Sequence, residues 1–255
     1  MSAELSQSPS TGGSGPLSSL SAADVDAAAT RIAGVVTPTP LQLSDRLSAT
    51  TGANVYLKRE DLQTVRSYKL RGAYNLLVQL SDEELAAGVV CSSAGNHAQG
   101  FAYACRTLGI RGRVYVPAKT PKQKRDRIRY HGGEFIELIV GGSTYDLAAE
   151  AALADVQRTG ATLVPPFDDP RTMAGQGTIA VEILSQLDGE PDLVVVPVGG
   201  GGCIAGITTY LAERTSKTSV LGIEPAGAAA MMAALARLIR PSRNAAFVPG
   251  SRVSR

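Results

Sequence analysis

Three short stretches decide the fold of this chain, and the first is Ser67-Tyr68-Lys69-Leu70-Arg71-Gly72-Ala73. The second is Ser92-Ser93-Ala94-Gly95-Asn96-His97-Ala98-Gln99-Gly100, and the third is Gly199-Gly200-Gly201-Gly202-Cys203-Ile204-Ala205-Gly206. The second and third stretches each follow an apolar, strand-like run and open a helix-like one. A strand, a short turn and a helix in repeated succession are typical of parallel α/β folds.

The rest of the chain continues this alternation. Apolar runs predict strands at Val55–Leu57, Val89–Cys91, Arg113–Val116, Glu134–Val140, Thr162–Val164, Leu193–Val196 and Val220–Ile223. Helical periodicity and capping residues predict helices over Ser21–Ala33, Lys69–Leu80, His97–Leu108, Lys122–Tyr130 and Ser143–Arg158. The runs at Leu193 and Val220 are continuously apolar, which predicts strands buried on both faces. We therefore expect an α/β fold whose parallel sheet is covered on both sides.

Composition and charge narrow the function classes. The chain has 255 residues, 44% hydrophobic and 19% charged, with a net charge of +2, so no bulk attraction to nucleic acid is expected. The basic run Lys122–Tyr130 lacks interleaved aromatic residues, and a solvated helix face is the favoured interpretation. No apolar run reaches the roughly 20 residues of a membrane span, and no signal-peptide pattern is present, so we expect a cytoplasmic protein. Cys91, Cys105 and Cys203 lack metal-ligand spacing, which predicts reduced thiols and no metal site.

Lys69 is the candidate for covalent chemistry. A lysine amine becomes nucleophilic when its surroundings depress its pKa, and it then condenses with carbonyl compounds. A position at the start of a helix helps, because the positive end of the helix dipole disfavours the charged amine. The seven residues alone are equally compatible with the first turn of a surface helix and a solvated lysine.

The glycine run Gly199–Gly202 is the candidate anion site. Successive glycines can aim backbone N–H groups into one concavity, and the start of the following helix adds favourable potential for a phosphate. The run lacks the Lys-Ser/Thr of a P-loop, and no ribose-binding acid accompanies it as in a dinucleotide fingerprint. A flexible loop without a ligand is the remaining alternative.

Taken together, the three stretches resemble the fold-type-II pyridoxal-phosphate (PLP) enzymes, and most closely the biosynthetic threonine dehydratases. The resemblance runs from about Thr37 to Ala236. It includes Lys58-Arg59-Glu60-Asp61-Leu62-Gln63, otherwise a solvated turn, and the segments Pro165–Asp169 and Ala174–Thr178, for which we expect a place at the substrate-side wall.

The resemblance implies a two-lobed fold similar to the tryptophan synthase β chain, with three-layer αβα parallel sheets and PLP between the lobes. The expected division is a disordered segment (residues 1–20), a large PLP-binding lobe (21–64 and 165–236, incomplete), a small lobe (65–164) and an aberrant basic tail (237–255).

The resemblance also implies roles for single residues. Lys69 matches the catalytic lysine that links to PLP and later takes the Cα proton of the substrate. The cofactor-binding positions are Lys69, Asn96, Gly199, Gly200, Gly201, Gly202 and Cys203. Asn96 matches the asparagine that bonds the ring hydroxyl of PLP, whereas His97, alone at a helix start, is interpreted as structural. Racemases of the family carry a serine at the position of Ala94, so elimination is favoured over racemisation.

The implied reaction is dehydration of L-threonine, and more weakly of L-serine, to a 2-oxo acid and ammonia; threonine yields 2-oxobutanoate for isoleucine biosynthesis. Serine dehydratase or racemase activity and threonine synthase are the enzymatic alternatives. Members of this family are usually homo-oligomers. A non-catalytic remnant that binds PLP, or binds a full-length subunit, is the alternative from another class.

The resemblance ends after Ala236. Residues 237–255 carry five arginines, no acid and no helical or strand period. Family members continue instead with more of the large lobe, and biosynthetic members usually add a C-terminal regulatory domain that is not found here. We therefore expect a truncated or frame-shifted gene product; a genuine short variant with a basic tail is the alternative, less favoured because it would leave the large lobe incomplete.

From this expectation we predict that the 255-residue chain aggregates, holds little PLP and has little dehydratase activity, because uncovered apolar surface forfeits roughly 25 cal/mol per Å². Removing residues 237–255 should change little, whereas restoring family-like sequence after Ala236 should give a monodisperse yellow protein in size-exclusion chromatography. A monodisperse 255-residue chain with dehydratase activity comparable to that restored chain would contradict this.

Overall fold

The protein is described by a computed structural model that covers residues 20–238. The expected disordered segment, apart from Leu20, and the expected basic tail, apart from residues 237 and 238, lie outside the described residues. The α-helices are α1 (Ala22–Ile32), α2 (Asp45–Thr51), α3 (Lys69–Leu77), α4 (Asp82–Ala87), α5 (Asn96–Leu108), α6 (Lys122–Gly132), α7 (Tyr145–Thr159), α8 (Pro170–Gln186), α9 (Gly202–Arg214) and α10 (Ala230–Leu238). The strands are β1 (Leu41–Leu43), β2 (Tyr56–Lys58), β3 (Val89–Ser92), β4 (Gly112–Val116), β5 (Ile136–Val140), β6 (Thr162–Leu163), β7 (Leu193–Pro197) and β8 (Ser219–Ile223).

Every strand and helix predicted from the sequence is present, with ends that differ by a few residues. At α1, Ser21 Oγ accepts from the backbone N–H of Asp24 and the Asp24 carboxylate accepts from the N–H of Ser21, which confirms the expected capping box. Helix α5 ends at Gly109, whose φ of 71° is left-handed, as predicted. Helix α7 begins one residue later than expected, because Thr144 rather than Ser143 caps it.

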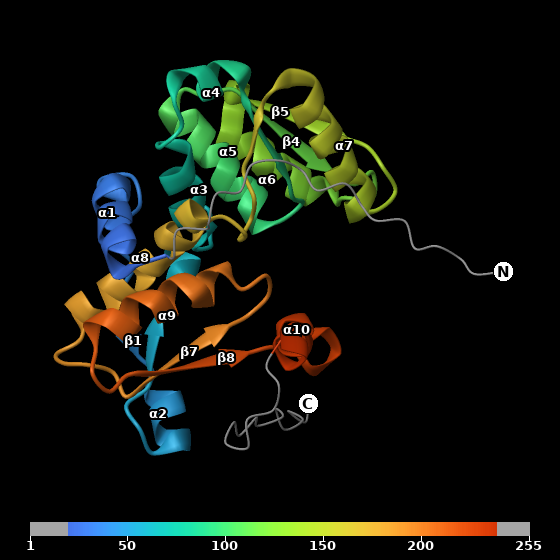
Figure 1. The fold of residues 1–255 in the computed structure, drawn as a ribbon. Coiled ribbons are helices and arrows are strands. Elements are labelled where there is room, and N and C mark those ends of the chain that lie inside the picture. Colours follow the sequence, from blue (N-terminus) through green and yellow to red (C-terminus); the bar gives the residue numbers. More distant parts are fainter. Residues whose placement is uncertain (1–19, 239–255) are drawn as a thin grey trace.

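A four-stranded parallel sheet with strand order β5-β4-β3-β6 forms the core of the upper part of Figure 1. Alternate residues of its strands point to opposite faces. On one face Val89, Cys91 and Val114 pack with buried residues of α3, α5 and α6. On the other face Val90 and Tyr115 pack against α7. This part of the chain has the predicted αβα layers.

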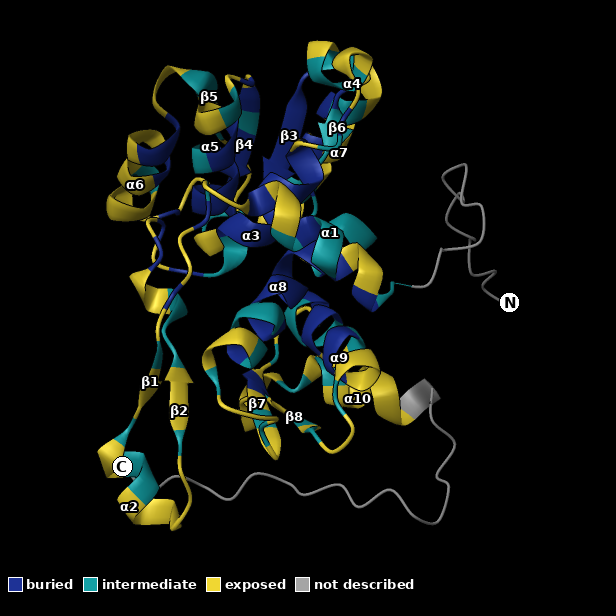
Figure 2. Cartoon of the chain, turned by 90° about the vertical axis from the view of Figure 1, so that its left-hand side faces the viewer, coloured by how far each residue is buried: buried dark blue, intermediate teal, exposed yellow. Residues whose placement is uncertain are grey.

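Strands β7 and β8 form a separate parallel pair, and here one prediction is wrong. Val194, Val196 and Val220 pack with α1, α8 and α9. The opposite face carries Leu193, Val195, Leu221 and Ile223, which are 51%, 50%, 48% and 52% exposed. Figure 2 shows this exposure along both strands. Continuous apolar sequence predicted burial on both faces, but among the described residues the helices cover one face only.

Helix α8 lies between α3 and α9 (Figure 1) and packs on both through glycines. A Cβ built on Gly175 would lie 2.6 Å from the carbonyl oxygen of Arg71. A Cβ on Gly177 would lie 2.9 Å from the carbonyl oxygen of Gly206, and one on Gly206 would lie 2.1 Å from that of Met173. The segment Ala174–Thr178, expected at the substrate-side wall, is therefore buried in helix packing instead.

A buried ion network fixes α3 and α8 to β2. Arg71 is fully buried, and its guanidinium donates to Glu60 at 2.8 and 2.9 Å and to Glu182 of α8 at 2.7 Å. Lys58 Nζ also lies 2.5 Å from Glu182. Each charge has opposite-sign partners, which is how such groups are tolerated away from water. The stretch Lys58–Asp61, interpreted as a solvated turn, is thus partly structural; only the Arg59–Asp61 pair stays exposed.

The glycine packing predicts a measurable loss of stability. Gly206→Ala should lower the free energy of unfolding by about 1–3 kcal/mol or more, because the added methyl group meets backbone atoms that cannot move aside. Gly141→Ala is the control, since a Cβ there has no atom within 4 Å, and it should stay within about 0.5 kcal/mol. Urea unfolding monitored by circular dichroism measures both. Equal midpoints for the two variants would contradict the packing argument.

Candidate active site

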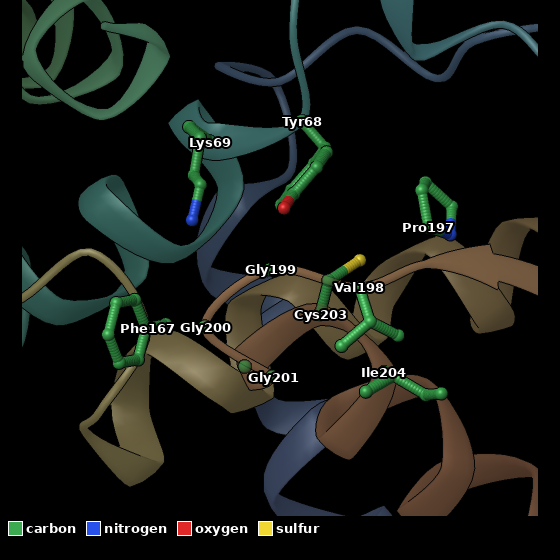
Figure 3. A pocket seen from close by; sticks show the side chains of 11 residues that line it. Tyr68, Lys69, Phe167, Pro197, Val198, Gly199, Gly200, Gly201, Cys203 and Ile204 are labelled. Atoms are coloured by element: carbon green, nitrogen blue, oxygen red, sulfur yellow. The ribbon is translucent and has the colours of Figure 1, made fainter. Parts of the chain in front are cut away.

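A cavity of about 230 Å³ lies between the start of α3 and the start of α9. Figure 3 shows its lining side chains. The residues that line it are Tyr68, Lys69, Phe167, Pro197, Val198, Gly199, Gly200, Gly201, Gly202, Cys203 and Ile204. The cavity thus brings together Lys69 and the glycine stretch, which are about 130 residues apart in the chain, and it has no carboxylate in its lining.

Lys69 is the first residue of α3 and is held from two sides. Its Nζ donates to the carbonyl oxygen of Pro166 at 2.6 Å and lies 5.2 Å from the centre of the Tyr68 ring. Helix α5 contacts the backbone behind it, because a Cβ on Gly100 would lie 2.9 Å from the carbonyl carbon of Lys69. Glycine is the only residue type that permits this approach without a shift of the two backbones.

Burial depresses the pKa of Lys69 below its ordinary value, a shift that only an ionised Cys203 would oppose. A lowered pKa increases the fraction of neutral amine, the form that attacks a carbonyl. Burial also raises the pKa of Tyr68, and it raises the pKa of Cys203 to about 12. The phenol and the thiol therefore keep their protons at neutral pH. Among the lining side chains, the Lys69 amine is the one whose shifted pKa favours its nucleophilic form.

The glycine loop presents unused backbone donors. The N–H groups of residues 199–204 have no acceptor within the described part of the chain. Gly201, with φ at 86°, turns the backbone into α9, and no side chain caps that helix. Gly200 and Gly202 pack on Phe167, whose ring would lie 2.2 Å from a Cβ on Gly200. Free N–H groups at a helix N-terminus form a site for a phosphate.

The cavity fits a ligand that carries both an aldehyde and a phosphate, which are the functional groups of PLP. A half-buried amine lies at one side and a cradle of N–H donors at the other. A side chain on Gly200 or Gly202 would displace Phe167 and distort this cradle. The arrangement can therefore bind an anion and place its carbonyl group near a nucleophile.

Asn96 and His97 begin α5, outside the cavity lining. Asn96 is exposed, and it lies one helical turn before Gly100, the residue in contact with Lys69. Its contact with a PLP ring stays a prediction. His97 is 2% exposed, and its Nε2 lies 2.9 Å from the carbonyl oxygen of Val164. Cys203, also named from the sequence, lines the cavity.

No role was predicted from the sequence for five of the residues that line the cavity, Tyr68, Phe167, Pro197, Val198 and Ile204. Phe167 and its neighbour Pro166 belong to a segment that resembles dehydratase sequence. Pro166 accepts the hydrogen bond of Lys69, and Phe167 lies against the glycine loop. Neither contact has a signal in the sequence, because the partners are 97 and 33 residues away.

In residues 20–238, no three His, Cys, Asp or Glu side chains gather as metal ligands. No helix of that range is long and apolar enough to cross a membrane.

The chain is similar to curated proteins that are named biosynthetic L-threonine dehydratases. Biosynthetic L-threonine dehydratase of Mycobacterium tuberculosis is 87% identical over 236 residues, which is 92% of this chain and 54% of that protein. The Bacillus subtilis protein of the same name is 51% identical over 195 residues, covering 76% and 46%. This chain therefore spans about half the length of the curated relatives it matches.

Solved structures agree with these relatives. The processed form of threonine deaminase isoform 2 from Solanum lycopersicum superimposes with a TM-score of 0.80 at 43% identity, covering 86% of this chain and 62% of that one. Serine racemase from Dictyostelium discoideum superimposes with a TM-score of 0.77 at 30% identity, covering 82% and 67%. The sequence profile of the family described as "Pyridoxal-phosphate dependent enzyme" matches residues 32–254. The chain belongs to this family of pyridoxal-phosphate dependent enzymes.

Proposed function

We propose that this chain carries the lysine and phosphate sides of a PLP-dependent L-threonine dehydratase, which converts L-threonine to 2-oxobutanoate and ammonia and accepts L-serine more weakly. The observation that carries the proposal is the single cavity lined by both Lys69 and the glycine loop. The names of the relatives support the substrate, since proteins up to 87% identical are called biosynthetic L-threonine dehydratases. The pathway would then be that of isoleucine.

The bound PLP supplies an aldehyde and an electron-withdrawing ring that stabilises negative charge at the substrate Cα. Lys69 is the residue that would hold the aldehyde through its amine, and the same Nζ would accept the proton from the substrate Cα. Burial supports this role, because it lowers the pKa of the amine and leaves more of it neutral. The Pro166 carbonyl holds Nζ in one place between these tasks.

The glycine loop would hold the phosphate. Its free N–H groups would bind the oxygens, and the start of α9 would contribute positive potential. Tyr68 and Cys203 remain protonated beside Lys69, so they add no negative charge that would hold the amine in its charged form. Asn96 is proposed to bond the ring hydroxyl. Ala94, at the racemases' serine position, supports elimination over racemisation.

We also propose that the two groups of elements in Figure 1 are the two lobes of this fold, with residues 65–164 as the small lobe and residues 21–64 and 165–236 in the large one. The separate sheets support this division. The cytoplasm is proposed as the location because the relatives are named as biosynthetic enzymes.

Lys69 should carry the cofactor. Incubation with PLP and reduction with borohydride, followed by peptide mass mapping, should place the pyridoxyl group on Lys69, because its amine alone lines the cavity. Lys58, paired with Glu182, and the exposed Lys119 are internal controls. A label on either of them instead of Lys69 would remove the proposed site. Assay of 2-oxobutanoate formed from threonine then tests the reaction.

A negative charge in the glycine loop should prevent phosphate binding. Gly199 is the best position, because a Cβ there meets no atom within 4 Å, whereas one on Gly200 meets Phe167. Gly199→Asp should weaken PLP binding at least about tenfold more than Gly199→Asn does, since charge repulsion in a partly desolvated site costs about 1–4 kcal/mol. Fluorescence titration measures both affinities. Equal values would move the phosphate site elsewhere.

A further inference from the structure

The imidazole of His97 has a single polar contact in the described part of the chain. Its Nε2 lies 2.9 Å from the carbonyl oxygen of Val164. A carbonyl only accepts, so Nε2 must carry the proton, and in a neutral ring Nδ1 does not. Nδ1 is buried and has no partner within residues 20–238. A substitution of His97 therefore removes one identifiable hydrogen bond.

The ring is neutral under ordinary conditions. Burial lowers the pKa of His97 to about 4; the hydrogen bond to Val164 opposes that shift, and the charge of Lys69 adds to it. At neutral pH His97 is therefore a fixed N–H donor and not an acid or a base.

The segment that accepts this hydrogen bond, Val164–Phe167, has its Val164 side chain buried in the core but makes few other hydrogen bonds. The N–H of Val164 donates to Val90 at 2.8 Å. Pro165 and Pro166 have no N–H, so only their carbonyl groups can form backbone hydrogen bonds. The Pro165 carbonyl oxygen lies 3.5 Å from the Thr172 hydroxyl, at the distance limit of a hydrogen bond. The Pro166 carbonyl oxygen accepts a hydrogen bond from Lys69 Nζ.

The segment has a second contact with the cavity at its far end. Phe167 follows Pro166 directly, and its ring lies against Gly200 and its backbone against Gly202. One short segment therefore supplies both the acceptor for Lys69 and the packing partner of the glycine loop. The Val164 carbonyl is therefore connected through three residues of chain to contacts on both sides of the cavity.

We propose that His97 is a positioning residue for Lys69. By holding the Val164 carbonyl, its Nε2–H fixes the two prolines, so that the Pro166 carbonyl meets the Lys69 amine. His97 acts through this segment, since it does not line the cavity. The proposal rests on the proposed function for the importance of Lys69, but the hydrogen-bonded chain from His97 to Lys69 is testable without any cofactor.

The readout is the pH dependence of Lys69 acylation in the cofactor-free chain, measured with acetic anhydride and peptide mass spectrometry. The titratable groups around Lys69 are Tyr68 beside it, Cys203 on α9 and His97 on α5. In the parent protein Lys69 should titrate below the ordinary pKa of a lysine side chain, because it is partly buried. His97→Leu should let water reach the amine and move its titration upward. One pKa unit then gives about tenfold slower acylation near pH 8.

Two further variants separate positioning from general stability. His97→Gln places an amide N–H near the position of Nε2 and should restore the parental Lys69 profile, whereas His97→Asn is too short and should not. His131→Leu is the matched control, because His131 is the other histidine of the chain, is 4% exposed and packs on Tyr103 and Tyr130 away from the cavity. It should lower the melting temperature without changing the Lys69 profile.

The outcomes are distinct. A shift in His97→Leu and His97→Asn, absent from His97→Gln and His131→Leu, supports the proposal. If the leucine variant does not fold, the glutamine and asparagine pair decides alone. An unchanged Lys69 profile in the folded variants without the donor, or an equal shift in His131→Leu, overturns it. Because no PLP is present, a failure here is distinguishable from a failure of pyridoxyl mapping on the parent protein.

Discussion

The contact of α8 with α3 and α9 is the constraint on which the other parts of the structure depend. Gly175 of α8 lies so close to α3, and Gly177 of α8 so close to α9, that neither position has room for a Cβ atom. Such an approach maximises dispersion contacts but leaves no tolerance for side-chain growth. The Arg71 ion network crosses the same helices and adds directional bonds to Glu60 and Glu182. Shape and charge therefore fix one relative position of α3 and α9.

The cavity follows from that position. Lys69 begins α3 and Gly202 begins α9, so the two helix starts are placed by the helix bodies behind them. Neither group needs a contact with the other to be brought near it. The segment with Pro166 and Phe167 completes the wall just before α8 begins at Pro170. A rigid crossing of three helices thus supports a site made mostly of loop and helix ends, which is the usual division between scaffold and function.

The sequence predicts the order of elements well, because that order is a local property. Capping at Ser21, the stop at Gly109 and the apolar runs of the strands all lie within a few residues of what they determine. Contacts between distant segments leave weaker traces. The partner of Lys69 at Pro166, the burial of Glu60 with Arg71, and the uncovered face at Val195 all depend on what packs opposite, and periodicity carries no information about that. The glycine stretches are informative because close approach leaves only one residue type possible.

The position of α1 has a consequence for synthesis of the chain. Although α1 precedes the other described helices, it packs on α8 and α9, and its residues Ala22 and Asp26 are bonded to Glu213 and Arg214, about 190 residues later. At roughly 5–20 residues per second, a ribosome needs on the order of ten to forty seconds to provide these partners. The four-stranded sheet, within residues 89–163, has its partners near in sequence and can form sooner. The apolar side chains of α1 that pack on α8 and α9, Ala22, Val25 and Ala28, therefore stay in contact with water or a chaperone until those helices have been synthesised.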